Sequence, residues 1–190
     1  AIYSYTDALM LSGETASGKY PLEAVKTMAA IAEQAEKDRN AMGEWEVPMN
    51  ENCSQREFLA HAAIDATRRI GVAGIITDSL TGETVRHLAA FRGPNPVLAI
   101  CYKEKTQRWL NLSYGVIPIH QKEQASAEYM FIAALRMLRQ KGYITLDDKI
   151  AYLSGSFGLG NPTGTTLLEI NQVSQVFDKS YEFHLPQKEQ

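Results

Sequence analysis

The chain has 190 residues, a net charge of -3 and an isoelectric point near 5.8. Its 45% hydrophobic and 22% charged residues are typical of a globular protein with one core and an appendage. The acidic balance, with no basic stripe, argues against nucleic-acid binding, and no apolar run approaches the roughly 18–20 residues that span a bilayer. Cys53 and Cys101 lack the spacing of a disulfide framework or a zinc site. We therefore expect a cytoplasmic protein without membrane or nucleic-acid partners.

Residues 1–40 predict a strand followed by a helix. The apolar run Asp7–Leu11 is typical of a buried strand, and a polar loop follows at residues 12–21. Pro21 suits the first turn of a helix, and apolar residues then recur at helical spacing. A buried parallel strand needs partners on both sides. Either the chain is a piece of a larger protein, or this strand pairs with a later one.

A linker is expected at residues 41–53, which contain Gly43, Pro48 and two asparagines. Ser54 and Glu57 then form a capping box at the start of a helix. From residue 72 the chain alternates between strands and helices. Strands are predicted at 72–77, 97–101, 116–119, 149–154 and 166–173, and helices at 84–91, 106–112 and 125–140. A polar tail, expected to be partly disordered, occupies 175–190.

This alternation predicts an α/β fold over residues 54–174, in which a mostly parallel five-stranded sheet lies between two helical layers. The last connection, residues 155–164, is too short for a helical crossover. The final strand should therefore run antiparallel to its neighbour.

A candidate phosphate-binding loop joins the first strand of this domain to a helix. Its sequence is Ser79-Leu-Thr-Gly-Glu-Thr84. Hydroxyl groups and a glycine before a helix N-terminus suit an anion, because the free N–H groups point outward and the helix dipole favours negative charge. The alternative interpretation is a plain helix cap, since serine and threonine are preferred there without any ligand.

The segment Asp7-Ala-Leu-Met-Leu-Ser-Gly-Glu-Thr-Ala-Ser-Gly-Lys-Tyr-Pro21 resembles the pyruvate kinase motif D-A-x-M-L-S-G-E-T-A-x-G-x-Y-P. The resemblance implies that residues 1–40 are the last strand and helix of a (β/α)8 catalytic barrel. It further implies that residues 54–174 are the C-terminal allosteric and assembly domain of that family. The chain would then be a C-terminal fragment of such an enzyme.

The same resemblance implies what the parent enzyme does. It would transfer a phosphoryl group from phosphoenolpyruvate to ADP, giving pyruvate and ATP, with Mg²⁺ and K⁺, as a homotetramer. The family's catalytic and metal-binding groups lie on earlier barrel strands, so we expect no catalytic residue, metal ligand or cofactor in this fragment. Glu14 is expected to fix its own loop through backbone hydrogen bonds.

For the loop, the family pattern [ST]-x-[ST]-G-x-[ST] matches Ser79, Thr81, Gly82 and Thr84 and implies a phosphorylated small-molecule effector. A second effector loop of the family corresponds to residues 155–164, with Gly158 and Gly160 as candidate contacts. The variable positions hold Leu80 and Glu83, and neither loop contains lysine or arginine. The positive charge for a bisphosphate would have to come from residues on neighbouring strand ends, namely Lys103, Lys105, Arg108 or Lys122.

Two rival functions are weighed against this interpretation. A stand-alone anion-binding module would have no use for a barrel-closing strand. A self-contained enzyme built on the 155–164 loop would need a nucleophile and a base, and the sequence offers no such pair. The four histidines show no ligand spacing. We expect the side chains of Cys101 and Trp109 to pack against other apolar residues.

Overall fold

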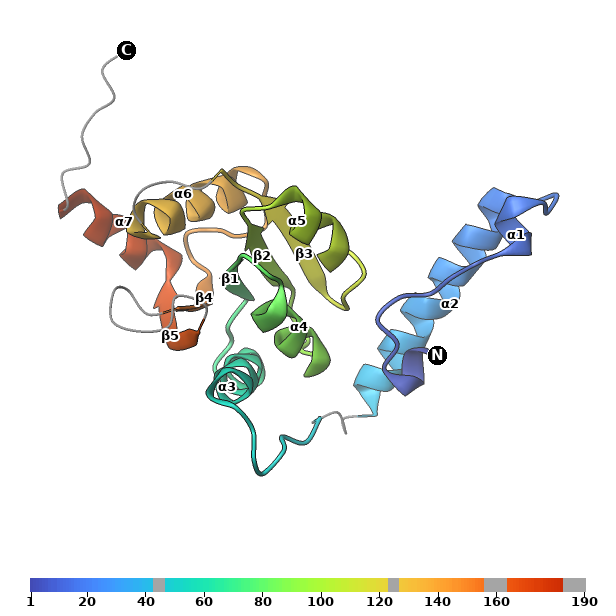
Figure 1. The fold of residues 1–190 in the computed structure, drawn as a ribbon, viewed down its shortest axis with the longest axis horizontal. Helices are drawn as coiled ribbons and strands as arrows, with labels where there is room; N and C mark the ends of the chain where they lie inside the picture. Colours follow the sequence, from blue (N-terminus) through green and yellow to red (C-terminus); the bar gives the residue numbers. More distant parts are fainter. Residues whose placement is uncertain (43–46, 123–126, 156–163, 183–190) are drawn as a thin grey trace, which may run out of the picture.

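A computed structural model describes residues 1–42, 47–122, 127–155 and 164–182 of the chain. Figure 1 shows an N-terminal arm, residues 1–42, beside an α/β domain. The arm contains η1 (Ile2–Ser4), α1 (Gly13–Ala16) and α2 (Pro21–Ala41). The helices of the α/β domain are α3 (Gln55–Arg69), α4 (Glu83–Ala90), α5 (Glu104–Leu110), α6 (Ala127–Gln140) and α7 (Val173–Glu182). Its strands are β1 (Gly74–Ser79), β2 (Val97–Cys101), β3 (Val116–His120), β4 (Lys149–Gly155) and β5 (Thr165–Gln172).

The five strands form one sheet in the order β3-β2-β1-β4-β5. The pairs β1–β2, β2–β3 and β1–β4 are parallel, and β4–β5 is antiparallel. The predicted fold class is therefore confirmed. Each parallel connection carries a helix, whereas β4 and β5 are joined by a short loop, which allows only the antiparallel pairing.

Both faces of the sheet are buried, because successive side chains of a strand point to opposite faces. Ile75 of β1 packs in a core with α3 and α4, and its neighbour Ile76 packs in a second core with α6 and α7. Both isoleucines are fully buried. The sheet is thus the middle of three layers (Figure 1). This burial explains the continuous apolar runs that predicted the strands.

The predicted strand at Asp7–Leu11 is wrong. This segment is extended but belongs to none of the ladders among the described residues, and Met10 is 87% exposed. A strand is defined by hydrogen bonds to a neighbour, and no strand of this sheet lies alongside it. The loop predicted at residues 12–21 also contains the short helix α1.

A helix that the sequence did not predict, α7, begins at Val173 and covers the first part of the tail, and residues 183–190 lie outside the described residues. Val173 is fully buried, and Val176 and Phe177 pack against the α6 side of the core. These three positions follow helical spacing. The predicted capping box is confirmed, since the Glu57 N–H donates to Ser54 Oγ at 3.2 Å and the Ser54 N–H to Glu57 Oε2 at 2.8 Å.

Candidate functional site

The candidate site lies where the chain changes direction in the sheet. From β1 the chain proceeds to β2 and β3 on one side, whereas β4 pairs with the other side of β1. In open α/β sheets, ligands bind outside the carboxyl ends of the two strands at such a switch point. The loops that follow β1 and β4 are the two that the sequence singled out. Because β1 and β4 are parallel neighbours, their carboxyl ends lie at the same edge of the sheet.

A direct contact joins these two regions. The hydroxyl of Thr84, in the first turn of α4, lies 2.7 Å from the hydroxyl of Thr165 at the start of β5. Thr165 is buried, with 6% of its surface exposed. Gly158 and Gly160, the candidate contacts of the second loop, lie outside the described residues.

The turn between β1 and α4 is closed by the side chain of Ser79. Ser79 is buried, and its Oγ accepts a hydrogen bond of 2.7 Å from the Gly82 N–H. Gly82 has a φ of +83°, and a Cβ there would meet a Leu110 methyl group at 3.1 Å. The hydroxyl of Ser79 thus holds the turn, while Thr81 is exposed.

An ion pair occupies the N-terminus of α4. Arg56 Nη1, from the first turn of α3, lies 2.6 Å from Glu83 Oε2. The Glu83 side chain is 49% exposed and the Arg56 side chain 20%. Sequence reasoning missed Arg56, because no local pattern connects it with a residue 27 positions later. Only the packing of α3 against α4 brings the two together.

Two of the four cations proposed from the sequence, Lys103 and Lys122, follow strand ends at the same edge of the sheet. Cys101 pairs in register with Ser79, and His120 pairs with Cys101, so Lys103 and Lys122 follow strand ends one and two strands from β1. Lys103, Lys105 and Lys122 are exposed. Arg108 lies 3.5 Å from Glu104 on its own helix. The Arg56 side chain, by contrast, contacts the loop through Glu83.

A buried tyrosine, Tyr152, links β4 to β1 next to the switch point. Tyr152 of β4 stacks on Phe131 of α6 with ring centroids 4.0 Å apart, and its hydroxyl donates to Asp78 Oδ1 of β1 at 3.3 Å. Burial, reinforced by the nearby Asp78 carboxylate, raises the pKa of Tyr152. The hydroxyl therefore stays neutral and links the two strands.

Other residues considered from the sequence have structural surroundings. Cys101 is fully buried, and burial raises the pKa of its thiol to about 11, which fits the packing role expected for it. His61 contacts the Phe91 ring edge-on at 5.0 Å. Across the four described ranges, no three His, Cys, Asp or Glu side chains gather into a metal site. In the same ranges no helix combines the length and hydropathy of a membrane span.

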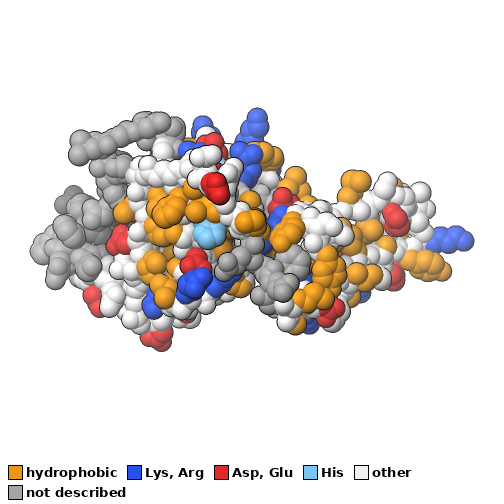
Figure 2. Space-filling view, turned by 90° about the horizontal axis from the view of Figure 1, so that it is seen from below, with side chains coloured by type: hydrophobic (Ala, Val, Ile, Leu, Met, Phe, Trp, Pro, Cys, Tyr) orange, Lys and Arg blue, Asp and Glu red, His pale blue; other side chains and the backbone are white. Residues whose placement is uncertain are grey.

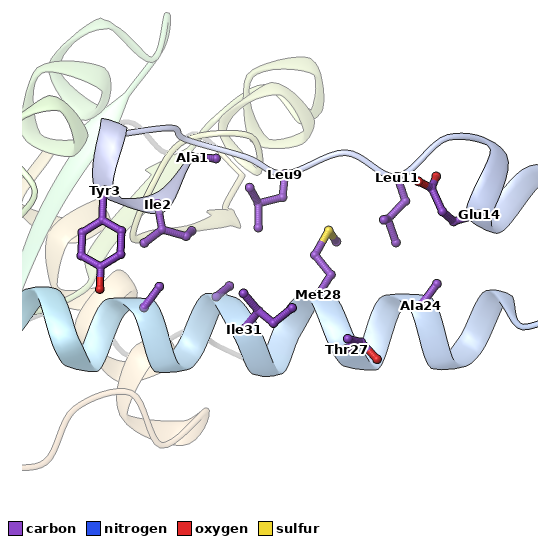
Figure 3. A pocket seen from close by; sticks show the side chains of 12 residues that line it. Ala1, Ile2, Tyr3, Leu9, Leu11, Glu14, Ala24, Thr27, Met28 and Ile31 are labelled. Atoms are coloured by element: carbon purple, nitrogen blue, oxygen red, sulfur yellow. The ribbon is translucent and has the colours of Figure 1, made fainter.

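In the arm, the extended segment before α1 runs along α2 and leaves a groove of about 580 Å³ between them (Figure 3). Leu9 and Leu11 point toward α2, and Met28 points back from it (Figure 3). Ile31, which also lines the groove, is 65% exposed, and Val25 of α2 is 45% exposed. Figure 2 shows hydrophobic side chains along the arm, at the right of the view. Glu14 Oε2 accepts from the Ser12 N–H at 2.9 Å, as expected for a residue that fixes its own loop.

The sequence profile of the pyruvate kinase alpha/beta domain matches residues 57–170. The chain belongs to the pyruvate kinase family. The pyruvate kinase of Borreliella burgdorferi is 37% identical over 175 residues, covering 91% of this chain and 36% of its own length. That of Clostridium acetobutylicum is 35% identical over 167 residues, covering 87% of this chain and 35% of its own length. The crystal structure of a pyruvate kinase from Cryptosporidium parvum superposes with a TM-score of 0.71 at 25% identity, covering 86% of this chain and 32% of that one.

The chain thus spans about a third of the length of these pyruvate kinases. The profile covers the α/β domain alone, from the first turn of α3 to β5. Because the Borreliella match covers 91% of the chain, it includes a large part of the arm as well. The resemblance first noted in the Asp7–Pro21 motif is confirmed.

Proposed function

We propose that this chain is the C-terminal regulatory and assembly part of a pyruvate kinase. The parent enzyme would transfer a phosphoryl group from phosphoenolpyruvate to ADP in the cytoplasm. The observation that carries the proposal is the extent of the match: the profile of the alpha/beta domain fills residues 57–170, and the chain corresponds to about a third of its relatives. Residues 1–40 would be the end of the catalytic barrel, 41–53 a linker and 175–190 a tail.

Catalysis would belong to the rest of the parent enzyme. Phosphoryl transfer depends on metal ions and cationic groups that neutralise the transferred phosphate. We assign Mg²⁺ and K⁺ to that other part and no catalytic residue to this chain. The purified chain, incubated with phosphoenolpyruvate, ADP, Mg²⁺ and K⁺ in a coupled assay, should show no turnover. Activity that survives stringent purification would contradict the assignment.

The regulatory role would rest on a phosphorylated small molecule bound at the switch point. Ser79, Thr81, Gly82 and Thr84 would form one side of this site and Gly158 and Gly160 the other. Support comes from the sheet order and from the Thr84–Thr165 contact. Two features oppose tight binding, since Ser79 already engages the Gly82 N–H and Glu83 adds a negative charge.

Binding should therefore be weak, and calorimetric titration with inorganic phosphate and with a sugar phosphate tests it. A saturable binding isotherm in the parent chain, together with a lower affinity in Thr84→Val, supports the site. A complete absence of binding at millimolar concentrations would favour a domain that serves assembly alone.

For assembly, we propose association between copies of the α/β domain. β5 lies at one edge of the sheet, and edge strands can pair with a strand of another chain. Sedimentation velocity over a range of concentrations should show a species larger than the 21.1 kDa monomer. A single monomeric species at high concentration would assign assembly to other parts of the parent enzyme.

A further inference from the structure

Arg92, which follows α4, binds the arm at the start of the Asp7–Pro21 motif. Its Nη1 lies 2.7 Å from Asp7 Oδ1, and its Nη2 donates to the carbonyl oxygen of Tyr5. The Arg92 side chain is only 6% exposed, whereas the Asp7 side chain is 53% exposed. A buried guanidinium is costly to leave without its partners. The arm therefore supplies two acceptors to a guanidinium that is buried in the presence of the arm.

Tyr114, in the turn before β3, joins the same cluster. Its backbone N–H donates to Asp7 Oδ1 at 3.1 Å, and the Arg92 guanidinium lies over its ring at 4.6 Å from the centroid. Arg39, in the last turn of α2, donates to the Tyr114 hydroxyl at 2.7 Å and is 4% exposed. The arm is thus attached at two points, residues 5–7 and the end of α2, and both attachments meet at Tyr114.

The backbone conformation of Arg92 indicates that the contacts of its side chain stabilise this position. Arg92 has a φ of +52°, in the left-handed region, at the position after the helix where glycine is common. The neighbouring Gly93 does not take this role, and a Cβ there would lie 2.6 Å from an Ile64 methyl group. A residue other than glycine in this conformation carries strain that the surrounding structure must offset. Here the offsetting contacts are those with the arm.

We propose that Arg92 is the positioning residue that holds residues 5–7, and with them the start of the Asp7–Pro21 motif, at a fixed orientation to the α/β domain. Asp7 is the first residue of that motif, so the contact controls where the motif begins. If the motif belongs to a catalytic barrel, as the proposed function holds, Arg92 joins that barrel to the α/β domain. The contact within this chain does not depend on that assignment.

The test measures the distance between the two parts in the 190-residue chain. Nitroxide labels are placed at Glu33→Cys on α2 and Gln140→Cys on α6, both exposed, in a Cys53→Ser background. Cys101 is fully buried and escapes labelling. Pulsed electron spin resonance should give one narrow distance distribution for this parent. Arg92→Gly removes the side chain and suits the left-handed backbone, so the α/β domain should stay folded by circular dichroism while the distribution broadens.

Two further variants sharpen the result. Arg92→Lys keeps the charge, but a lysine ammonium cannot bind both acceptors as a planar guanidinium does. The width of its distance distribution should therefore lie between those of the parent and Arg92→Gly. Arg108→Gln, which removes an arginine that pairs with Glu104 of the same helix, should leave the distribution narrow. An unchanged narrow distribution in Arg92→Gly overturns the proposal. Should that variant fail to fold, Asp7→Ala removes the acceptor from the arm instead, and an unchanged distribution there overturns it equally.

Discussion

The guanidinium of Arg56 lies 2.6 Å from the carboxylate of Glu83, across the N-terminus of α4. An anion that approaches the Ser79–Thr84 loop would meet this pair. Glu83 repels it, and Arg56 can neutralise it only by giving up part of its contact with Glu83. Both side chains reach solvent, so the pair adds little to stability and mainly sets the charge of the loop.

Reversing the charge at position 83 should tighten phosphate binding. Glu83→Lys removes the repulsion, breaks the contact between Arg56 and Glu83 and adds a cation. Since charge effects at a helix end are about 0.3–1 kcal/mol, we expect Kd for a sugar phosphate to fall roughly twofold to fivefold. Titration calorimetry measures this. Glu104→Lys, at the start of α5, is the matched control, and equal affinities for the two variants would show that Glu83 does not face the ligand.

Removing the hydroxyl of Thr84 should destabilise the fold through Thr165. In Thr84→Val the buried Thr165 hydroxyl loses its 2.7 Å partner, at a cost of about 1–3 kcal/mol in the free energy of unfolding. Adding Thr165→Val should restore part of this loss, because no unsatisfied hydroxyl then remains. Urea denaturation of the two single variants and the double variant checks the coupling. Strict additivity would mean that the two hydroxyls contribute independently.

The cap of α3 should weaken in acid. A hydrogen bond from the Ser54 N–H, followed by one from the Ser54 hydroxyl, lowers the pKa of Glu57 below its ordinary value of 4.5. The folded pKa lies below the unfolded one, so the contribution is present above pH 4.5 and is lost as pH falls through the folded pKa.

Glu57→Gln should therefore flatten the dependence of the urea midpoint on pH below 4.5. Ser54→Ala should cost about 1 kcal/mol at neutral pH. If the urea midpoint of Glu57→Gln changes with pH below 4.5 in the same way as that of the parent, Glu57 does not cause the loss of stability in acid.

Tyr152 should make the domain less stable in alkali. Burial raises its folded pKa above the ordinary value of 10, so the unfolded chain loses this proton first. The contribution is complete below pH 10 and declines as pH rises through the folded pKa. Tyr152→Phe should cost about 1 kcal/mol at neutral pH through the lost Asp78 contact. Its urea midpoint should then fall less steeply above pH 10 than that of the parent. An identical alkaline slope would show that Tyr152 ionises without unfolding.

The structure differs from the sequence-based prediction at Asp7–Leu11 and at α7 for one reason: whether a strand or helix forms depends on the elements that pack beside it. Asp7–Leu11 has the composition of a buried strand, yet a strand exists only where another strand pairs with it, and none in this sheet does. At the end of the chain, Val173, Val176 and Phe177 recur at helical spacing among polar residues, and they are buried because they pack with α6. Local pattern could not decide either case, because the deciding partner lies elsewhere in the chain.

By itself the sequence determined the alternation of strands and helices, the antiparallel last strand, the capping box at Ser54 and the family, through a motif that needs no folding to be recognised. These follow from periodicity and spacing over a few residues. The tertiary structure alone decided that β1 lies beside β4, in the order β3-β2-β1-β4-β5, and that Thr84 contacts Thr165 at the start of β5. It also decided that Glu83 pairs with Arg56 and Asp7 with Arg92. Contacts across 27 and 85 residues depend on how helices pack on the sheet, which no local pattern encodes.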